Sequence, residues 1–340
     1  MEYLKKQFEE ELDAEGEIAI RGHIYGRTEI LSTNLRPDAY DLAFIQWSED
    51  WRDRQIEEAD EYLEEFETTK RFAGLVRAFK TSEMLPFVGA GMSIETGYPA
   101  WTPTLFLLCK ASSLDEKELQ RMLGEGRYEE AAQRLHDDLG PALFNGKLEH
   151  IFADDLEPCG VVNALPELFP RGTVITTNFD PLLERVFKKD QGFDEIESGS
   201  NLDEAIRVHT SGSRMLLKIH GHCKKIGTRV LLKTEYDKAY TDDSLVNQFF
   251  NDVMFGRSFI FLGCSLYTDR TISAMAKVVA DKGADKLPRH YAIVELKEGD
   301  DQNQRERELA NSNIFPIWYP HKQHTAIEAL LTKLKFESDD

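Results

Sequence analysis

Two hydrophobic patterns divide the chain near residue 83. Before this point, apolar residues from Ile56 to Phe66 recur at alternating spacings of three and four, as on the buried face of an amphipathic helix. No Gly or Pro occurs from 55 to 73, so we predict a helix over 55–73. Gly74 interrupts its continuation toward Phe79, since an interior Gly costs a helix about 1 kcal/mol relative to Ala.

Beyond residue 83, short apolar runs alternate with helical stretches, which is typical of an α/β fold. Several runs are continuously apolar, as in strands buried on both faces of a parallel sheet. We predict a Rossmann-like, doubly wound parallel sheet. The stretch from 104 to 170 holds no convincing strand and predicts a small inserted helical module. The predicted strands are Leu85–Val88, Thr173–Thr176, Leu216–Ile219, Val230–Leu232, Phe259–Leu262, His290–Leu296 and Ile314–Trp318, and the predicted helices are Pro181–Lys188, Ser244–Phe255, Arg270–Asp281, Asn303–Ala310 and Ala326–Leu334.

Charge sets the first 80 residues apart. They hold 20 acidic and 11 basic side chains, a net charge of -9 out of -20 for the whole chain. We interpret 1–80 as an acidic helical N-terminal extension and 81–340 as a separate α/β domain. The acidic face of the extension is either solvated or a surface for oligomer or partner contacts, because Phe44, Trp47 and Trp51 also need to be covered.

The overall composition restricts the classes of function that the chain can have. The 340 residues make 39.0 kDa with 41% hydrophobic and 30% charged residues, as in ordinary globular proteins. A charge of -20 disfavours direct nucleic-acid binding. No apolar run approaches the roughly 18 residues of a membrane span, and no apolar signal core follows Met1, so we expect a cytoplasmic protein. Cys109, Cys159, Cys223 and Cys264 contain no C-x-x-C pair, so neither a zinc ribbon nor a disulfide framework is indicated.

The first chemical motif is a glycine-rich turn after an apolar strand. In Gly89-Ala90-Gly91-Met92-Ser93, the glycines permit close approach of a ligand, and the following helix start favours a diphosphate. Ile94 replaces the third glycine of the dinucleotide fingerprint, and a simple tight turn also explains the pattern.

Three further motifs each follow a predicted strand. They are Thr176-Thr177-Asn178-Phe179-Asp180, Lys218-Ile219-His220-Gly221-His222 and Leu262-Gly263-Cys264-Ser265. Ligands of open α/β sheets bind beyond the carboxyl ends of the strands, where these residues would project. Asp180 could equally cap the helix beginning at Pro181, and a lone His is usually structural.

Taken together and in this order, the four motifs resemble those of sirtuins, over about 235 residues from Leu85 to Tyr319. The match is nearest to the sirtuin-like NAD hydrolases of bacterial antiphage defence, which can act with a HerA-type ATPase. Leu231-Leu232-Lys233-Thr234-Glu235-Tyr236-Asp237 and Pro316-Ile317-Trp318-Tyr319 also resemble this branch.

The resemblance implies hydrolysis of NAD to nicotinamide and ADP-ribose, with no metal. Asn178 would orient water or the ribose hydroxyls, His220 would act as general base or polarise a ribose hydroxyl, and Asp180 would bind the nicotinamide amide. The implied NAD contacts are Gly89, Ala90, Gly91, Ser93, Thr177, Gly263 and Ser265. By analogy with related systems, we also expect a homo-oligomer and control by assembly or by a HerA-type ATPase.

Departures from deacylating sirtuins favour hydrolysis. Only Cys223 lies between the His-Gly and G-x-S motifs, so the paired zinc cysteines are absent, and Pro99-Ala100-Trp101-Thr102 lacks their Asp and Arg. A protein deacylase, an ADP-ribosyltransferase and a silent nucleotide-binding scaffold remain alternatives. A metal-dependent nuclease is a further one, with candidate ligands Asp180, Asp237, Asp242, Asp243 and Asp269, although their spacing matches no metal motif.

Overall fold

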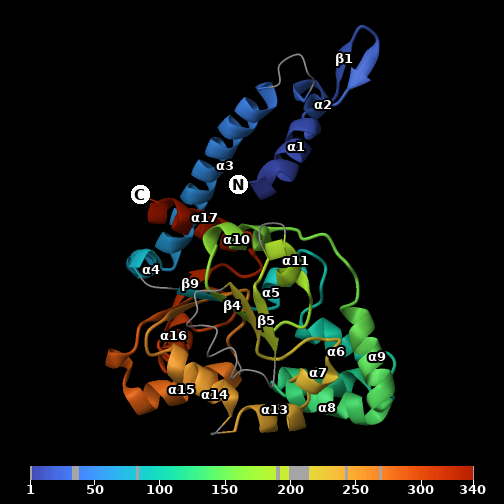
Figure 1. The fold of residues 1–340 in the computed structure, drawn as a ribbon, viewed down its shortest axis with the longest axis vertical. Helices are drawn as coiled ribbons and strands as arrows, with labels where there is room; N and C mark the ends of the chain where they lie inside the picture. The colour runs from blue at the N-terminus through green and yellow to red at the C-terminus, as the bar shows by residue number, and fades with distance from the viewer. Residues whose placement is uncertain are drawn as a thin grey trace.

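A seven-stranded parallel sheet forms the centre of the computed structural model (Figure 1). The structure describes residues 2–32, 38–81, 84–188, 192–198, 214–241, 244–267 and 270–339. The strand order is β5-β6-β4-β3-β7-β8-β9, so the chain switches sides of the sheet between β3 and β7. The strands are β3 (Met84–Val88), β4 (Thr173–Thr176), β5 (Glu195–Ser198), β6 (Met215–Lys218), β7 (Ser258–Leu262), β8 (His290–Glu295) and β9 (Ile314–Tyr319).

Apolar side chains cover both faces of this sheet, because successive residues of a strand point to opposite sides. Val88 and Leu262 belong to one core, and Phe87 and Phe261 belong to the other. The predicted doubly wound α/β sheet is therefore confirmed. Helices α4 (Thr69–Thr81), α11 (Leu182–Lys188) and α17 (Ala326–Asp339) pack on the first face, and α14 (Leu245–Val253), α15 (Arg270–Lys282) and α16 (Gln302–Ala310) pack on the second.

The stretch between β3 and β4 is helical, as the sequence predicts, and no strand occurs between residues 104 and 170. Four of its helices gather beside the sheet and reach α13 (Lys233–Ala239) through α8 (Figure 1). The helices of this stretch are α5 (Gly91–Ile94), α6 (Trp101–Cys109), α7 (Glu116–Gly124), α8 (Tyr128–Leu139), α9 (Pro141–Ile151) and α10 (Leu165–Leu168).

The N-terminal segment forms an arm. Helix α3 (Ala39–Glu65) packs against α17, while its first half stands away from the sheet together with α1 (Figure 1). The ring of Phe8 lies 5.5 Å from that of Phe44 and 5.6 Å from that of Trp47, so α1 covers part of the aromatic face of α3. The remaining elements of the arm are α1 (Lys5–Ala14), the hairpin β1 (Ile18–Ile20) and β2 (His23–Tyr25), and α2 (Arg27–Leu31).

The single helix predicted over 55–73 is wrong: two helices, α3 and α4, divide that stretch. The chain breaks at Glu67, whose φ of 54° is left-handed. Gly74, expected to interrupt a helix, lies inside α4. A Cβ on Gly74 would lie 3.0 Å from the Tyr291 hydroxyl, so this glycine permits close packing of α4 against β8.

The predicted strand Val230–Leu232 is also wrong, although its side chains are buried. The backbone N–H groups of Leu231 and Leu232 donate to the carboxylate of Glu235, at 2.8 and 2.9 Å, and the segment leads into α13. Strand β5 was not predicted. It is a polar edge strand that pairs with β6, and Ile196 on it is 46% exposed.

Candidate active site

The ends of four neighbouring strands lie in one row. Val88 of β3 pairs with Thr176 of β4 and with Leu262 of β7, and Thr176 pairs with Lys218 of β6. All these strands are parallel, so the residues that follow them emerge at the same edge of the sheet. The four sequence motifs therefore meet there, at the topological switch point where ligands of open α/β sheets bind.

Three of the predicted residues form one buried hydrogen-bonded cluster. Asn178 Nδ2 donates to Ser93 Oγ at 3.2 Å, and the Ser93 hydroxyl bonds in turn to the Asp180 carboxyl group. Thr176 fixes the loop, because its hydroxyl donates to the Val88 carbonyl at 2.7 Å and accepts the Asn178 N–H at 3.0 Å. The cluster thus joins the glycine-rich turn after β3 to the loop after β4.

Asp180 has a structural role as well. Its Oδ1 accepts the backbone N–H of Leu182 at 3.1 Å, so it caps the start of α11, as the alternative interpretation of the sequence predicts. Its side chain is buried, and burial raises the pKa of the Asp180 carboxyl group while nearby Lys218 opposes that rise.

Lys218 is a buried cation beneath this loop. It is 1% exposed, and its Nζ donates to the backbone carbonyl of Asp180 at 2.6 Å and to Glu184 Oε1 at 2.9 Å. A buried charge needs such partners. The sequence signal was a single Lys ending the apolar run of β6, but it did not reveal that this side chain supports the Asp180 loop.

His220 lies two residues beyond the end of β6 and is buried. Its Nε2 is 2.7 Å from the hydroxyl of Tyr240, and its Nδ1 is 3.3 Å from the hydroxyl of Tyr236. Burial alone lowers the pKa of His220 to about 3, with no charged group acting on it, so the imidazole is neutral at physiological pH. A neutral imidazole can accept a proton, as a general base must.

The glycines at the sheet edge have a packing reason. A Cβ on Gly89 would lie 2.5 Å from the Gly263 carbonyl oxygen, and one on Gly263, whose φ is +65°, would lie 2.5 Å from the Met92 nitrogen. The N–H groups of Gly89 and Gly91 donate to the carbonyls of Leu262 and Gly263, at 2.8 and 2.9 Å. The two loops flanking the switch point are thus held together backbone to backbone.

The other predicted NAD contacts lie outside the hydrogen-bonded cluster. Ala90 and Thr177 are half-buried, and Ser265 is exposed. The Ser265 carbonyl accepts a long bond of 3.5 Å from Arg305. The structure therefore unites Ser93, Asn178 and Asp180, and places His220 in the loop after the neighbouring strand β6. Ala90, Thr177 and Ser265 lie in the loops at the same sheet edge.

Sequence reasoning missed Tyr240 as a contact of His220. Tyr236 lies on α13 and Tyr240 directly follows its last residue, four positions later, and their rings stack with centroids 5.9 Å apart. Their spacing of four was visible, but it could not show that α13 packs against the end of β6.

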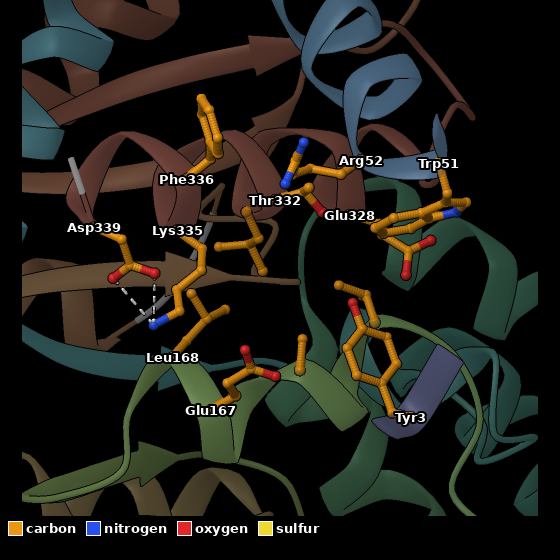
Figure 2. Close-up of a pocket in the computed structure, with 13 residues that line it drawn as sticks. Tyr3, Trp51, Arg52, Glu167, Leu168, Glu328, Thr332, Lys335, Phe336 and Asp339 are labelled. Atoms are coloured by element: carbon orange, nitrogen blue, oxygen red, sulfur yellow. Dashed lines mark hydrogen bonds and ion pairs between the residues drawn. The ribbon is translucent and has the colours of Figure 1, made fainter. Parts of the chain in front are cut away.

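A separate cavity of about 170 Å³ lies between the N-terminal arm, α10 and α17 (Figure 2). Tyr3, Trp51, Leu168 and Phe336 contribute to its walls, together with the carboxyl group of Glu328. Burial, with Glu95 and Glu58 nearby, raises the pKa of Glu328 to about 7. None of the motif residues lines this cavity.

No group of three or more His, Cys, Asp or Glu side chains that could hold a metal ion occurs among the described residues. Of the candidate nuclease ligands, Asp180 caps α11, and Asp237 is exposed and pairs with Lys233 and Arg270. Asp242, Asp243 and Asp269 lie outside the described residues. In the part of the chain that the structure describes, no helix is long and apolar enough to cross a bilayer.

Comparison with known proteins identifies a family likeness. Residues 172–317, which hold the Asn178, Asp180, His220 and Ser265 motifs, match the SIR2-like domain. The predicted resemblance to sirtuins is therefore confirmed for this part of the chain.

Similar curated proteins carry related names. The chain is 25% identical over 66% of its length to NAD(+) hydrolase ThsA of Enterococcus faecium, and 21% identical over 62% to NAD(+) hydrolase ThsA of Bacillus cereus (strain MSX-D12). It is 25% identical over 56% of its length to defense-associated sirtuin 2 of Bacillus subtilis. The aligned parts cover 45%, 43% and 19% of these proteins, so the chain spans less than half the length of the relatives it matches.

Proposed function

We propose that this chain, with its SIR2-like domain at residues 172–317, is an NAD+ hydrolase that depletes NAD in antiphage defence. The observation that carries the proposal is the meeting of Ser93, Asn178 and Asp180 in one buried cluster beside His220, at the carboxyl edge of the sheet. The names of the similar curated proteins support both the NAD hydrolysis and the defence role.

The proposed reaction breaks the bond between nicotinamide and ribose and joins a water oxygen to the ribose carbon. Its products are nicotinamide, ADP-ribose and one proton. The developing positive charge on the ribose needs little chemical help, so the site must mainly hold the sugar, orient water and accept a proton.

The chain's residues suit these tasks. The Asn178 amide is held by Ser93 and can orient water or a ribose hydroxyl. Neutral His220 can accept the proton and pass it to solvent, and Asp180 has a carboxyl group for the nicotinamide amide. Gly89, Ala90, Gly91, Thr177, Gly263 and Ser265 remain the proposed contacts of the rest of NAD.

The test is release of nicotinamide and ADP-ribose from NAD+ by the purified chain. Asn178→Ala and His220→Ala should each abolish release while leaving the circular dichroism spectrum unchanged. His222→Ala is the matched control, because His222 is the next histidine along the loop and is only half-buried. Full activity in either active-site variant would remove that residue from the proposed mechanism.

We further propose that the chain is cytoplasmic and forms a homo-oligomer through the N-terminal arm. On α3, Leu42 is 61% and Ile45 is 52% exposed, one helical turn apart. Burying these side chains against a second copy would remove them from water. Leu42→Arg should reduce the subunit count in light scattering. Leu143→Arg, at a 49% exposed leucine on α9, should not.

A HerA-type ATPase remains the proposed protein partner, with no direct contact between this chain and nucleic acid. The charge of -20 supports a division of labour in which any DNA contact belongs to the partner. Adding such an ATPase should raise nicotinamide release. An unchanged rate in a mixture that shows no complex by size exclusion would reject this partner.

A further inference from the structure

Both ring nitrogens of His220, the proposed general base, contact tyrosine hydroxyls in this structure. Tyr240 and Tyr236 reach His220 from one side, with ring centroids 5.9 and 5.1 Å from the imidazole and edge-to-face geometry. Their hydroxyls lie 2.7 Å from Nε2 and 3.3 Å from Nδ1. A general base needs a lone pair directed at the reacting hydroxyl, so this arrangement leaves His220 engaged with α13.

The distances indicate which tyrosine blocks the lone pair. Hydrogen bonds donated by O–H groups are typically about 2.7–2.8 Å long, whereas those donated by N–H groups are about 2.9–3.0 Å. The contact with Tyr240 is the shorter of the two, at 2.7 Å, and we assign the Tyr240 hydroxyl as its donor and Nε2 as its acceptor, with Tyr240 accepting from the Thr271 hydroxyl at 3.1 Å. The hydrogen of the neutral ring then lies on Nδ1, facing Tyr236.

Helix α13 is fastened over His220 by side chains from two other helices. Arg270, at the start of α15, donates to Asp237 of α13 at 2.7 Å and forms a two-pronged pair with Glu129 of α8. Thr234 of α13 bonds to Gln133 of α8 through its hydroxyl, at 2.9 Å. The helical module thus fixes the position of the two tyrosines.

We propose that Tyr240 is a gating residue for His220: it caps Nε2 in the closed state shown here, and a substrate hydroxyl must take its place before turnover. Tyr240 suits this role better than Tyr236, because it is half-buried at the C-terminal end of α13, whereas Tyr236 is buried beneath Arg270. The Arg270 contact with Asp237 holds α13, and with it Tyr240, in the closed position. The expected change in nicotinamide release rests on the proposed function, whereas the expected change in access to His220 does not.

The structural test measures how readily diethyl pyrocarbonate modifies His220 in the full chain, located by peptide mass spectrometry. The reagent attacks neutral imidazole, so access to Nε2 and not protonation limits the reaction at His220. Tyr240→Phe and Asp237→Asn should each increase the His220 modification rate about fivefold or more. Exposed His150 is the internal reference and should react at an unchanged rate.

The kinetic test compares two matched variants on NAD+ well below KM. Tyr240→Phe keeps the ring but removes the competing donor, so nicotinamide release should rise about fivefold, the effect of one net hydrogen bond of about 1 kcal/mol. Tyr62→Phe, which removes a hydroxyl that donates to Glu58 on α3, should change release less than twofold.

The outcomes separate the two proposals. Reduced release by Tyr240→Phe, or unchanged His220 modification in both Tyr240→Phe and Asp237→Asn, would overturn the gate. If no variant releases nicotinamide but His220 modification rises as expected, the gate stands and NAD hydrolysis is rejected.

Discussion

Glu328 provides a quantitative test of the packing between the N-terminal arm and the α/β fold around the sheet. Its carboxyl group lines the cavity between the arm, α10 and α17 (Figure 2). Among the described residues, no ion pair joins it to a cation, and the charges of Glu95 and Glu58 act on it. Burial and these neighbours raise the pKa of Glu328 from 4.5 to about 7.

The sign of the effect on stability follows from this shift. The unfolded chain loses the proton near pH 4.5, while the folded protein keeps it to about pH 7. Stability therefore falls as pH rises between these values and stays reduced above pH 7. A difference of about 2.5 pH units corresponds to about 3 kcal/mol, and solvent screening of this half-buried side chain reduces that to about 1–3 kcal/mol.

Glu328→Gln removes the ionisation with almost no change in shape. We expect the variant to be more stable than wild type by about 1–3 kcal/mol at pH 8 and to match it at pH 4. Urea unfolding followed by circular dichroism at both pH values measures the difference. A variant less stable than wild type at pH 8, or a difference independent of pH, would refute the buried, unpaired carboxylate.

Three further predictions concern the sheet edge. Gly263→Ala should lower the free energy of unfolding by more than about 2 kcal/mol, because a Cβ at this position meets the backbone. The control Gly299→Ala should lower it by only about 1 kcal/mol, because Gly299 also has a positive φ, +88°, but has open space around it. Equal losses would contradict the close packing at Gly263. Lys218→Met should lower the free energy of unfolding in urea by about 3–5 kcal/mol, because it leaves the Glu184 carboxylate without its cation. Adding Glu184→Gln should restore part of this stability. No restoration would argue against the Lys218–Glu184 ion pair. Since the pKa of His220 is lowered to about 3, kcat/KM for NAD+ should show no loss from protonation of His220 between pH 8 and pH 5. Burial lowers the pKa of neighbouring His222 to about 4, so a fall centred near pH 6.5 that is retained in His222→Ala would contradict the buried neutral base.

Much of the sheet was predictable, because most of its strands are buried on both faces and mainly apolar. Thr173–Thr176 and Phe259–Leu262 show this, and both form central strands. The triplet Val230–Leu232 is apolar but is not a strand, since the N–H groups of Leu231 and Leu232 donate to the Glu235 carboxylate. A single left-handed residue, Glu67, divides α3 from α4, and helical periodicity carries no signal for it.

The candidate site likewise contains residues that the sequence predicts and contacts that it does not. Asn178, Asp180 and His220 were predictable because parallel strands end at one edge, and local sequence places these residues just beyond two strand ends. Tyr240 reaches His220 from a helix 20 residues later, and Lys218 acts beneath the site through a backbone carbonyl. Both contacts depend on tertiary packing, which the local pattern does not encode.

NAD hydrolysis is tested most directly by incubating the purified wild-type chain with NAD+ and quantifying nicotinamide and ADP-ribose together by liquid chromatography. We expect equal amounts of the two products, formed without any acetylated peptide or protein acceptor and lost in His220→Ala. Nicotinamide without matching ADP-ribose would indicate transfer to another acceptor. No release, with or without a HerA-type ATPase, would contradict NAD hydrolysis.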